Sequence, residues 1–236
     1  INKLDGSGNK LWGEGGILLQ DGDSGSNIDL CVDGEGGVFT VWEYGGYRLW
    51  YPRGKVSHIG NDGSILTNYG SISSQGGDDG EGSSIANPMV IYSGTGEAIV
   101  GWEDSRDGLY YGWRSLRVQK FSAGPNWALG GVRVSLPNNV SSQIVSYCDI
   151  VSDGTGGVIA FWTDERNGNR DIFAQRVNSA GDIVWTEGGI TVCDAEDSQS
   201  NLQAVSDGSG GAVIVWVDRR SGGNKIYTQH IDGNGN

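Results

Sequence analysis

Short apolar segments alternate along this chain with turns rich in glycine, serine, asparagine and aspartate, and the alternation follows a long repeat. In each repeat a Gly-rich turn is followed nine residues later by tryptophan. The turns begin at Asp33, Ser93, Asp153 and Asp207, and the tryptophans are Trp42, Trp102, Trp162 and Trp216. Between turn and tryptophan the sequence is continuously apolar, as in GGVIAFW, which is typical of a strand buried on both faces. We find no helical periodicity, so every predicted element is a strand.

Each repeat carries three further strand signals separated by turn residues. One of them is a triplet of polar, basic and apolar residues, seen as Ser57-His58-Ile59, Gln119-Lys120-Phe121, Gln175-Arg176-Val177 and Gln229-His230-Ile231. Four short antiparallel strands in about 54 to 60 residues are the pattern of a propeller blade, and neighbouring blades bury one another's faces. The sequence therefore predicts an all-β fold, a β-propeller of four four-stranded blades. The alternative is a four-blade segment of a larger propeller.

A single domain is expected over residues 1–236. The predicted blades are residues 27–86, 87–146, 147–200 and 201–236, the last completed by residues 1–26. In that arrangement the segment around residues 17–19 pairs beside residues 226–232 and closes the ring. Closure is favoured because an open array leaves unpaired strand edges. However, INKLDG at the N-terminus and QHIDG near the C-terminus both fit the third-strand position, so four consecutive blades of a longer array stay an alternative.

Charge and composition exclude two classes of partner. The 236 residues include 29 acidic and 16 basic side chains, for a net charge of −13, whereas nucleic-acid binding requires clustered Lys and Arg. No apolar run approaches the roughly 18 residues of a membrane helix, so membrane insertion is not expected. The chain opens at Ile1 without an initiator methionine, and we expect it to be part of a larger protein or assembly. Cys31, Cys148 and Cys193 are expected as buried thiols, with one disulfide as the alternative.

Residues 162–190, WTDERNGNRDIFAQRVNSAGDIVWTEGGI, carry a recognisable pattern. They resemble the repeat of secreted bacterial β-propeller proteins with the pattern W-x-D-x-R-x-G, D-I-Y-A-Q-R and G-x-x-x-W-x-x-x-G-V. The similarity is good in the third and fourth repeats, fair in the second and weak in the first. It implies a propeller and a secreted or cell-surface location, but it implies no activity, because propellers host many functions.

The first strand of each repeat is the one expected nearest the propeller axis. Polar residues recur there at two positions that share a strand face. The first position holds Asn27, Asn87 and Asn201, and the second, two residues later, holds Asp29, Asp149 and Gln203. Their oxygens are suitable ligands for Ca²⁺, so calcium in the central channel is the one cofactor considered. Alternatively they bind loop backbone and water. A third hypothesis makes Asp29 and Asp149 the acid and base or nucleophile of a glycosidase.

Two other recurring patterns are assigned to structure. The Asp and Arg of W-x-D-x-R can pair on one strand face and fix a hairpin, as in Asp164 with Arg166 and Asp218 with Arg220. His58 and His230 stand where other repeats have Lys or Arg, so we expect surface cations there. The chain contains none of the common motifs for nucleophilic catalysis, phosphate binding or zinc.

The first two repeats have longer connections between their second and third strands. The added residues are aromatic and basic, and the candidate binding residues are Tyr47, Trp50, Tyr51, Arg53, Tyr110, Tyr111, Trp113 and Arg114. Aromatic side chains on one propeller face can stack on sugars or anchor a protein. The alternative is that they cover the outer edge of a blade.

These observations favour a non-catalytic extracellular binding or scaffold module, not an enzyme, that presents one propeller face to a protein or glycan. A glycoside hydrolase-like enzyme that uses channel carboxylates is the first alternative. A structural subunit of a cell-surface assembly is the second.

Overall fold

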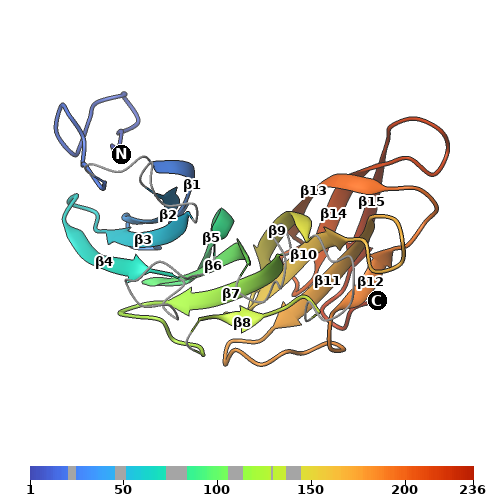
Figure 1. The fold of residues 1–236 in the computed structure, drawn as a ribbon. Coiled ribbons are helices and arrows are strands. Elements are labelled where there is room, and N and C mark those ends of the chain that lie inside the picture. Colours follow the sequence, from blue (N-terminus) through green and yellow to red (C-terminus); the bar gives the residue numbers. More distant parts are fainter. Residues whose placement is uncertain (21–24, 46–51, 73–83, 106–113, 129, 137–144) are drawn as a thin grey trace.

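The structure is a computed structural model, and it describes residues 1–20, 25–45, 52–72, 84–105, 114–128, 130–136 and 145–236. All regular elements among these residues are β-strands, grouped in four sheets that follow one another in an arc (Figure 1). The described residues include no helix of the length and apolarity needed to cross a bilayer. The predicted all-β propeller of four blades is therefore confirmed.

Each sheet is an antiparallel meander whose strands pair in chain order. The first sheet contains β1 (Gly25–Val32), β2 (Val38–Tyr44), β3 (Arg53–Ile59) and β4 (Ile65–Ser71). The second sheet contains β5 (Ile85–Gly94), β6 (Glu97–Asp104), β7 (Ser115–Phe121) and β8 (Val132–Arg133), and the third contains β9 (Ser146–Ser152), β10 (Val158–Asp164), β11 (Asp171–Val177) and β12 (Ile190–Cys193). The fourth sheet contains β13 (Gln199–Ser206), β14 (Ala212–Asp218) and β15 (Lys225–Ile231). The first strands of successive sheets contact one another, so β1, β5, β9 and β13 form the inner wall.

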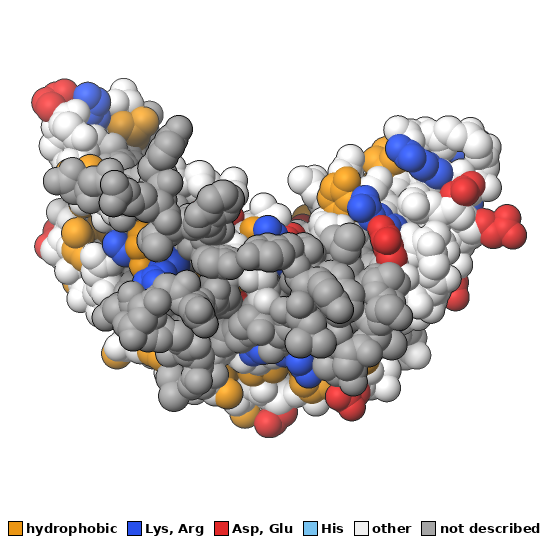
Figure 2. Space-filling model, in the orientation of Figure 1, with side chains coloured by type: hydrophobic (Ala, Val, Ile, Leu, Met, Phe, Trp, Pro, Cys, Tyr) orange, Lys and Arg blue, Asp and Glu red, His pale blue; other side chains and the backbone are white. Residues whose placement is uncertain are grey.

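The N-terminal segment lies beside the first sheet, and this corrects the expected closure of the ring. Trp12 Nε1 donates to Asn61 O at 3.1 Å, and Lys3 Nζ donates to Gly36 O at 2.7 Å. In the described part of the chain the fourth sheet has three strands, β13, β14 and β15, and residues 1–20 do not complete it. The first and last sheets stand at opposite ends of the arc with an opening between them (Figures 1 and 2).

Burial on both faces explains why the second strand of each repeat is continuously apolar. Every residue of β10 is buried. Trp162 and Ala160 pack in the core shared with the second sheet, whereas Ile159 and Phe161 pack in the core shared with the fourth. Successive strand residues point to opposite faces, so one strand serves two interfaces.

The W-x-D-x-R pattern forms a buried cluster at the end of the second strand. Trp162 Nε1 donates to Asp164 Oδ2 at 2.9 Å, and Arg166 Nε donates to both oxygens of Asp164. The Arg166 guanidinium lies 3.6 Å from the centre of the Phe173 ring. The fourth sheet repeats the arrangement, as predicted.

The first sheet departs from this pattern. Tyr44 stands where the other repeats have Asp, and Trp42 Nε1 is buried with no hydrogen-bond partner among the described residues. A buried donor without a partner costs on the order of 1–3 kcal/mol. The hydrogen-bonding capacity of the repeated tryptophan is therefore least well satisfied in the first repeat.

The Gly-rich turns of the first, third and fourth sheets are held by their first aspartate and by the basic residue of the third strand. Asp153 Oδ1 accepts the N–H groups of Thr155 and Gly157, and Asp153 Oδ2 accepts two from Arg176. His58 makes the corresponding 2.9 Å contact to Asp33. His58 is buried and stacks on Phe39, so the expectation of a surface cation is wrong there. The reason is that the third strand packs this residue under the neighbouring turn.

We expect Asp164→Ala to destabilise the protein by about 2 kcal/mol, because it leaves Trp162 Nε1 buried without a partner and removes the ion pair of Arg166, which keeps its hydrogen bond to Gly188 O. Urea unfolding followed by tryptophan fluorescence measures the change. Glu187→Gln, at an exposed position, is the control and should leave the free energy of unfolding unchanged. A change below about 1 kcal/mol for Asp164→Ala would contradict the assigned role.

The fourth sheet gives a pH-dependent prediction. Burial raises the pKa of Asp218, but hydrogen bonds from Arg220 and Trp216 outweigh it and lower the pKa from 3.8 to about 2. Because the folded pKa lies below the unfolded one, the carboxylate stabilises the fold above pH 4 and loses this contribution as pH falls towards 2. The difference in melting temperature between wild type and Asp218→Asn should therefore shrink over this range. A difference that stays constant from pH 6 to pH 2 would refute this linkage.

Candidate functional site

The inner strands share a bulge that places one residue of each in a left-handed conformation. The residues are Asn27, Asn87, Tyr147 and Asn201, with φ of 48°, 49°, 47° and 51°. The register of each inner strand shifts at this point. Asparagine tolerates positive φ well, which explains its recurrence at this position. Tyr147 is bulky and is strained there, and backbone strain of this kind is concentrated at functional sites.

Two buried glutamates meet at the bulge of the second sheet. Glu43 Oε1 accepts the backbone N–H of Asn87 at 2.7 Å and Asn27 Nδ2 at 2.8 Å. Glu103 Oε1 accepts Asn87 Nδ2 at 2.8 Å, and Glu103 Oε2 accepts Arg114 Nη1 at 2.9 Å. Asn87 thus holds one carboxylate through its backbone and the other through its side chain.

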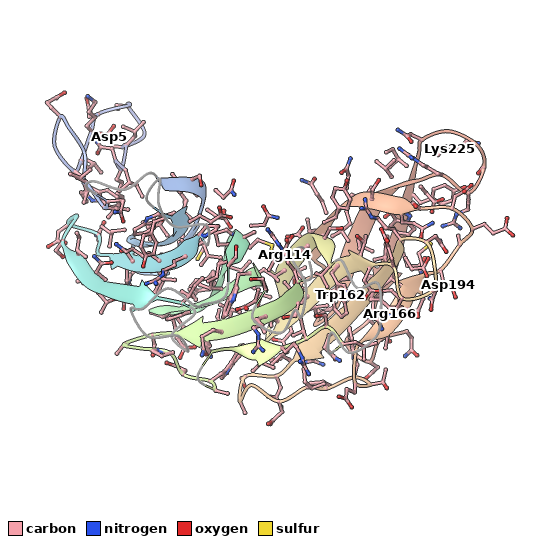
Figure 3. The ribbon with its side chains drawn as sticks, viewed as in Figure 1. Asp5, Arg114, Trp162, Arg166, Asp194 and Lys225 are labelled. Atoms are coloured by element: carbon pink, nitrogen blue, oxygen red, sulfur yellow. The ribbon has the colours of Figure 1, made fainter. Side chains whose placement is uncertain are left out.

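A cavity of about 490 Å³ opens beside Glu103 and Asn87, where the second and third sheets meet, and it reaches Leu202 of the fourth sheet; Glu43 is not among its lining residues. Its lining residues are Asn87, Glu103, Arg114, Val145, Ser146, Tyr147, Cys148 and Leu202. Figure 3 shows Arg114 on the inner side of the arc between these sheets. The cavity combines a carboxylate, a guanidinium, an amide and an aromatic ring, and its volume suits a small ligand.

The Cys148 thiol borders the carboxylate in this cavity. Cys148 Sγ lies 3.8 Å from Glu103 Oε1, and burial, together with the charge of Glu103, raises the pKa of the thiol well above its usual value. Cys148 is therefore a protonated donor and not a nucleophile. All three cysteines are free thiols, so the expected disulfide alternative is not observed.

Asp29 and Asp149 are half-buried on the inner strands β1 and β9, and they join neighbouring sheets. Asp29 Oδ2 accepts the N–H of Val90 in the second sheet, and Asp149 Oδ2 accepts the N–H of Ala204 in the fourth, each at 2.8 Å. Burial raises the pKa of Asp149, and the negative charge of Asp29 adds to it. Each carboxylate thus fastens the inner strand of its own sheet to the next.

The six predicted calcium ligands do not come together as one set of contacts. Asn27 and Asn87 bind the two glutamates, and the two aspartates bind backbone amides, while Asn201 and Gln203 are exposed on β13. Among the described residues no three His, Cys, Asp or Glu side chains are grouped to hold a metal ion. Calcium in the channel stays a prediction.

Of the eight predicted binding residues, the structure describes two. Arg53 begins β3 opposite Tyr44, and Arg114 lines the cavity. The other six, Tyr47, Trp50, Tyr51, Tyr110, Tyr111 and Trp113, lie outside the described residues.

Sequence reasoning missed Glu43 and Glu103, although a signal was present. The residue after the repeated tryptophan is Glu in the first two repeats but Thr163 and Val217 in the others. The W-x-D-x-R pattern instead draws attention to the next position, whose aspartate is buried in the sheet.

Solved structures with this fold are found by comparison, although no family model and no curated protein sequence matches the chain. A family 117 glycoside hydrolase from Zobellia galactanivorans has a TM-score of 0.52 and 8% identity, over 92% of this chain and 70% of that one. An exo-β-1,3-galactanase from Clostridium thermocellum has a TM-score of 0.50 and 14% identity, over 96% and 50%. An endo-arabinase from Bacteroides thetaiotaomicron has a TM-score of 0.49 and 13% identity, over 86% and 74%.

These comparisons overturn the expectation of a non-catalytic binding or scaffold module that is not an enzyme. Two solved structures that the chain resembles, at TM-scores of 0.52 and 0.50, are a family 117 glycoside hydrolase and an exo-β-1,3-galactanase. At such low identity the likeness establishes the fold, and the catalytic groups must be argued from this chain's own residues.

Tyr147→Asn should stabilise the fold by about 1 kcal/mol, because it relieves the left-handed strain that the other repeats avoid with asparagine. The matched control is Asn201→Tyr, which places the bulky residue at the exposed equivalent position of the fourth sheet and should destabilise by a similar amount. Urea unfolding of both variants measures the changes. Equal stability of Tyr147→Asn and wild type would show that Tyr147 is not strained.

Proposed function

We propose that this chain is a glycoside hydrolase-like enzyme that binds a glycan in the cavity between the second and third sheets. The observation that carries the proposal is the pair of buried glutamates, Glu43 and Glu103, that meet at Asn87. Glu103 and Asn87 line the cavity, and Glu43 is bound to the backbone of Asn87. Hydrolysis of a glycosidic bond requires two carboxyl groups that flank it. We further propose that the protein works outside the bacterial cell, in line with its repeat pattern.

The cavity offers the contacts that a sugar requires. Tyr147 provides an aromatic face that can lie against the apolar face of a sugar ring. Arg114, Asn87 and Ser146 provide donors and acceptors for its hydroxyl groups. The Arg170 guanidinium lies over the Tyr147 ring, 5.6 Å from its centre.

The two glutamates differ in their surroundings, and this assigns their roles. Arg114 pairs with Glu103 and fixes its position in the cavity, so Glu103 is the group that attacks the anomeric carbon or activates the water that does so. In this proposal Glu43, the second carboxyl group held at Asn87, is the acid that gives a proton to the glycosidic oxygen as the C–O bond breaks. Water is consumed, and the products are a new reducing end and a free hydroxyl group.

Asp29 and Asp149, the carboxylates chosen from the sequence, take a structural role in this proposal. Each accepts N–H groups from its own strand and from the inner strand of the next sheet. The raised pKa of Asp149 is compatible with an acid, so this pair is the competing assignment that the experiment must separate.

The test is release of reducing sugar from a panel of bacterial, plant and algal polysaccharides by wild type and four variants. Glu43→Gln and Glu103→Gln should each lower kcat by at least about 100-fold while the fold is kept, because they remove the acid and the nucleophile or base. Asp29→Asn and Asp149→Asn should lower the free energy of unfolding and leave kcat nearly unchanged.

Three results would contradict this proposal. No hydrolysis of any substrate by wild type would refute the enzyme. Full activity of Glu103→Gln would remove this glutamate from catalysis. Loss of activity only in the aspartate variants would assign the reaction to Asp29 and Asp149. Circular dichroism of each variant separates these outcomes from unfolding.

A further inference from the structure

Each interior interface of the arc buries one face of a sheet against the next sheet. Ile159, Phe161 and Ile172 of the third sheet are 0% exposed, because they pack in the core shared with the fourth sheet. In the second sheet, Ile99 and Leu116 are buried in the same way against the third. We call this surface the forward face of a sheet.

The forward face of the fourth sheet presents the same apolar pattern to solvent. Val213, Val215 and Ile226 occupy the positions of Ile159, Phe161 and Ile172, since they stand at the same distances from the repeated tryptophan. They are 38%, 38% and 70% exposed. Figure 2 shows hydrophobic side chains on the arm formed by the last sheet, beside the opening of the arc. Single exposed apolar residues are ordinary, but these form a patch with a buried counterpart in the same molecule.

The first sheet presents the complementary surface. This is the rear face of a sheet, which in the second, third and fourth sheets packs against the preceding sheet. Leu30 is 52% exposed on β1, whereas its counterparts Val90 and Ile150 are 4% and 3% exposed beneath the preceding sheet. Leu30 of the rear face is therefore exposed at one end of the arc and the forward face of the fourth sheet at the other (Figure 1). The centre of the rear face is already covered, since Thr40 and Trp42 are 1% and 3% exposed.

Residues 1–20 show what the first sheet is built to receive. Trp12 Nε1 donates to Asn61 O at 3.1 Å, just as Trp127 Nε1 of the second repeat donates to Ser179 O of the third at 3.1 Å. Lys3 reaches Gly36 O, as Lys120 reaches Gly156 O. The N-terminal segment thus occupies the position of the outer part of a preceding blade. The inner part of that blade consists of strands of the type of β13 and β14.

We propose that the forward face of the fourth sheet docks on the rear face of the first sheet of a second copy of this chain. The contact is head to tail, and it repeats the three interfaces already present within one chain. In this contact, His230 of one copy and Lys3 of the other would occupy the same repeat position. Either β15 or the segment around Lys3 must therefore move aside when the copies dock. Such a contact closes into a ring or continues as a chain of molecules, depending on the rotation between copies.

The test is sedimentation velocity of wild type and two charged variants, one for each face. Leu30→Glu blocks the rear face and Ile226→Glu blocks the forward face. Wild type should sediment as two or more copies of the 25.0 kDa chain, and each variant alone as one copy. Ile183→Glu, at an exposed apolar residue outside both faces, is the matched control and should sediment like wild type.

Mixing the two variants distinguishes a head-to-tail contact from a symmetrical one. Each variant keeps one intact face, so an equimolar mixture should recover a species of two copies. A wild type that stays at one copy up to about 100 µM, a typical weak-association range, would overturn the proposal. A mixture that stays at one copy, or association that survives both substitutions, would overturn it equally. Circular dichroism confirms that each variant remains folded. None of these outcomes depends on catalysis.

Discussion

A propeller sheet has two apolar faces and cannot bury either by itself. Everything else in this molecule depends on that constraint. The second strand of each repeat is apolar throughout because its alternate side chains serve two different interfaces, as Phe161 and Trp162 do. Hydrogen bonds between inner strands, such as the one from Val90 to Asp29, fix the spacing of the sheets. Where a neighbouring sheet is lacking, as beyond β15, the apolar face meets solvent.

The candidate site arises where this regular packing is interrupted. The bulge in each inner strand turns one residue into the left-handed conformation and leaves room at the inner wall. In the first and second sheets the space is used by asparagine and glutamate, which form one connected network. In the third sheet Tyr147 replaces asparagine and lines the cavity. A repeat that is structural in all four blades thus becomes chemically distinct in adjacent ones.

The sequence predicts the architecture well, because repeats, turn residues and apolar runs are local signals. It predicts the pairing of Asp164 with Arg166 for the same reason. It does not predict that residues 1–20 remain on the first sheet, because Leu4 and Ile231 fit the same strand position and only three-dimensional contacts decide between them.

The site was harder to predict, since its residues belong to different repeats. Asn87 lies on the inner wall and binds Glu43 and Glu103, which the repeat pattern does not single out. The central claim is that this cavity binds a glycan. Amide chemical shifts in nuclear magnetic resonance spectra, recorded while pooled oligosaccharides are added, test it most directly. The account predicts shifts clustered at Asn87, Tyr147 and Leu202; shifts confined to other parts of the chain, or none with any sugar, would contradict it.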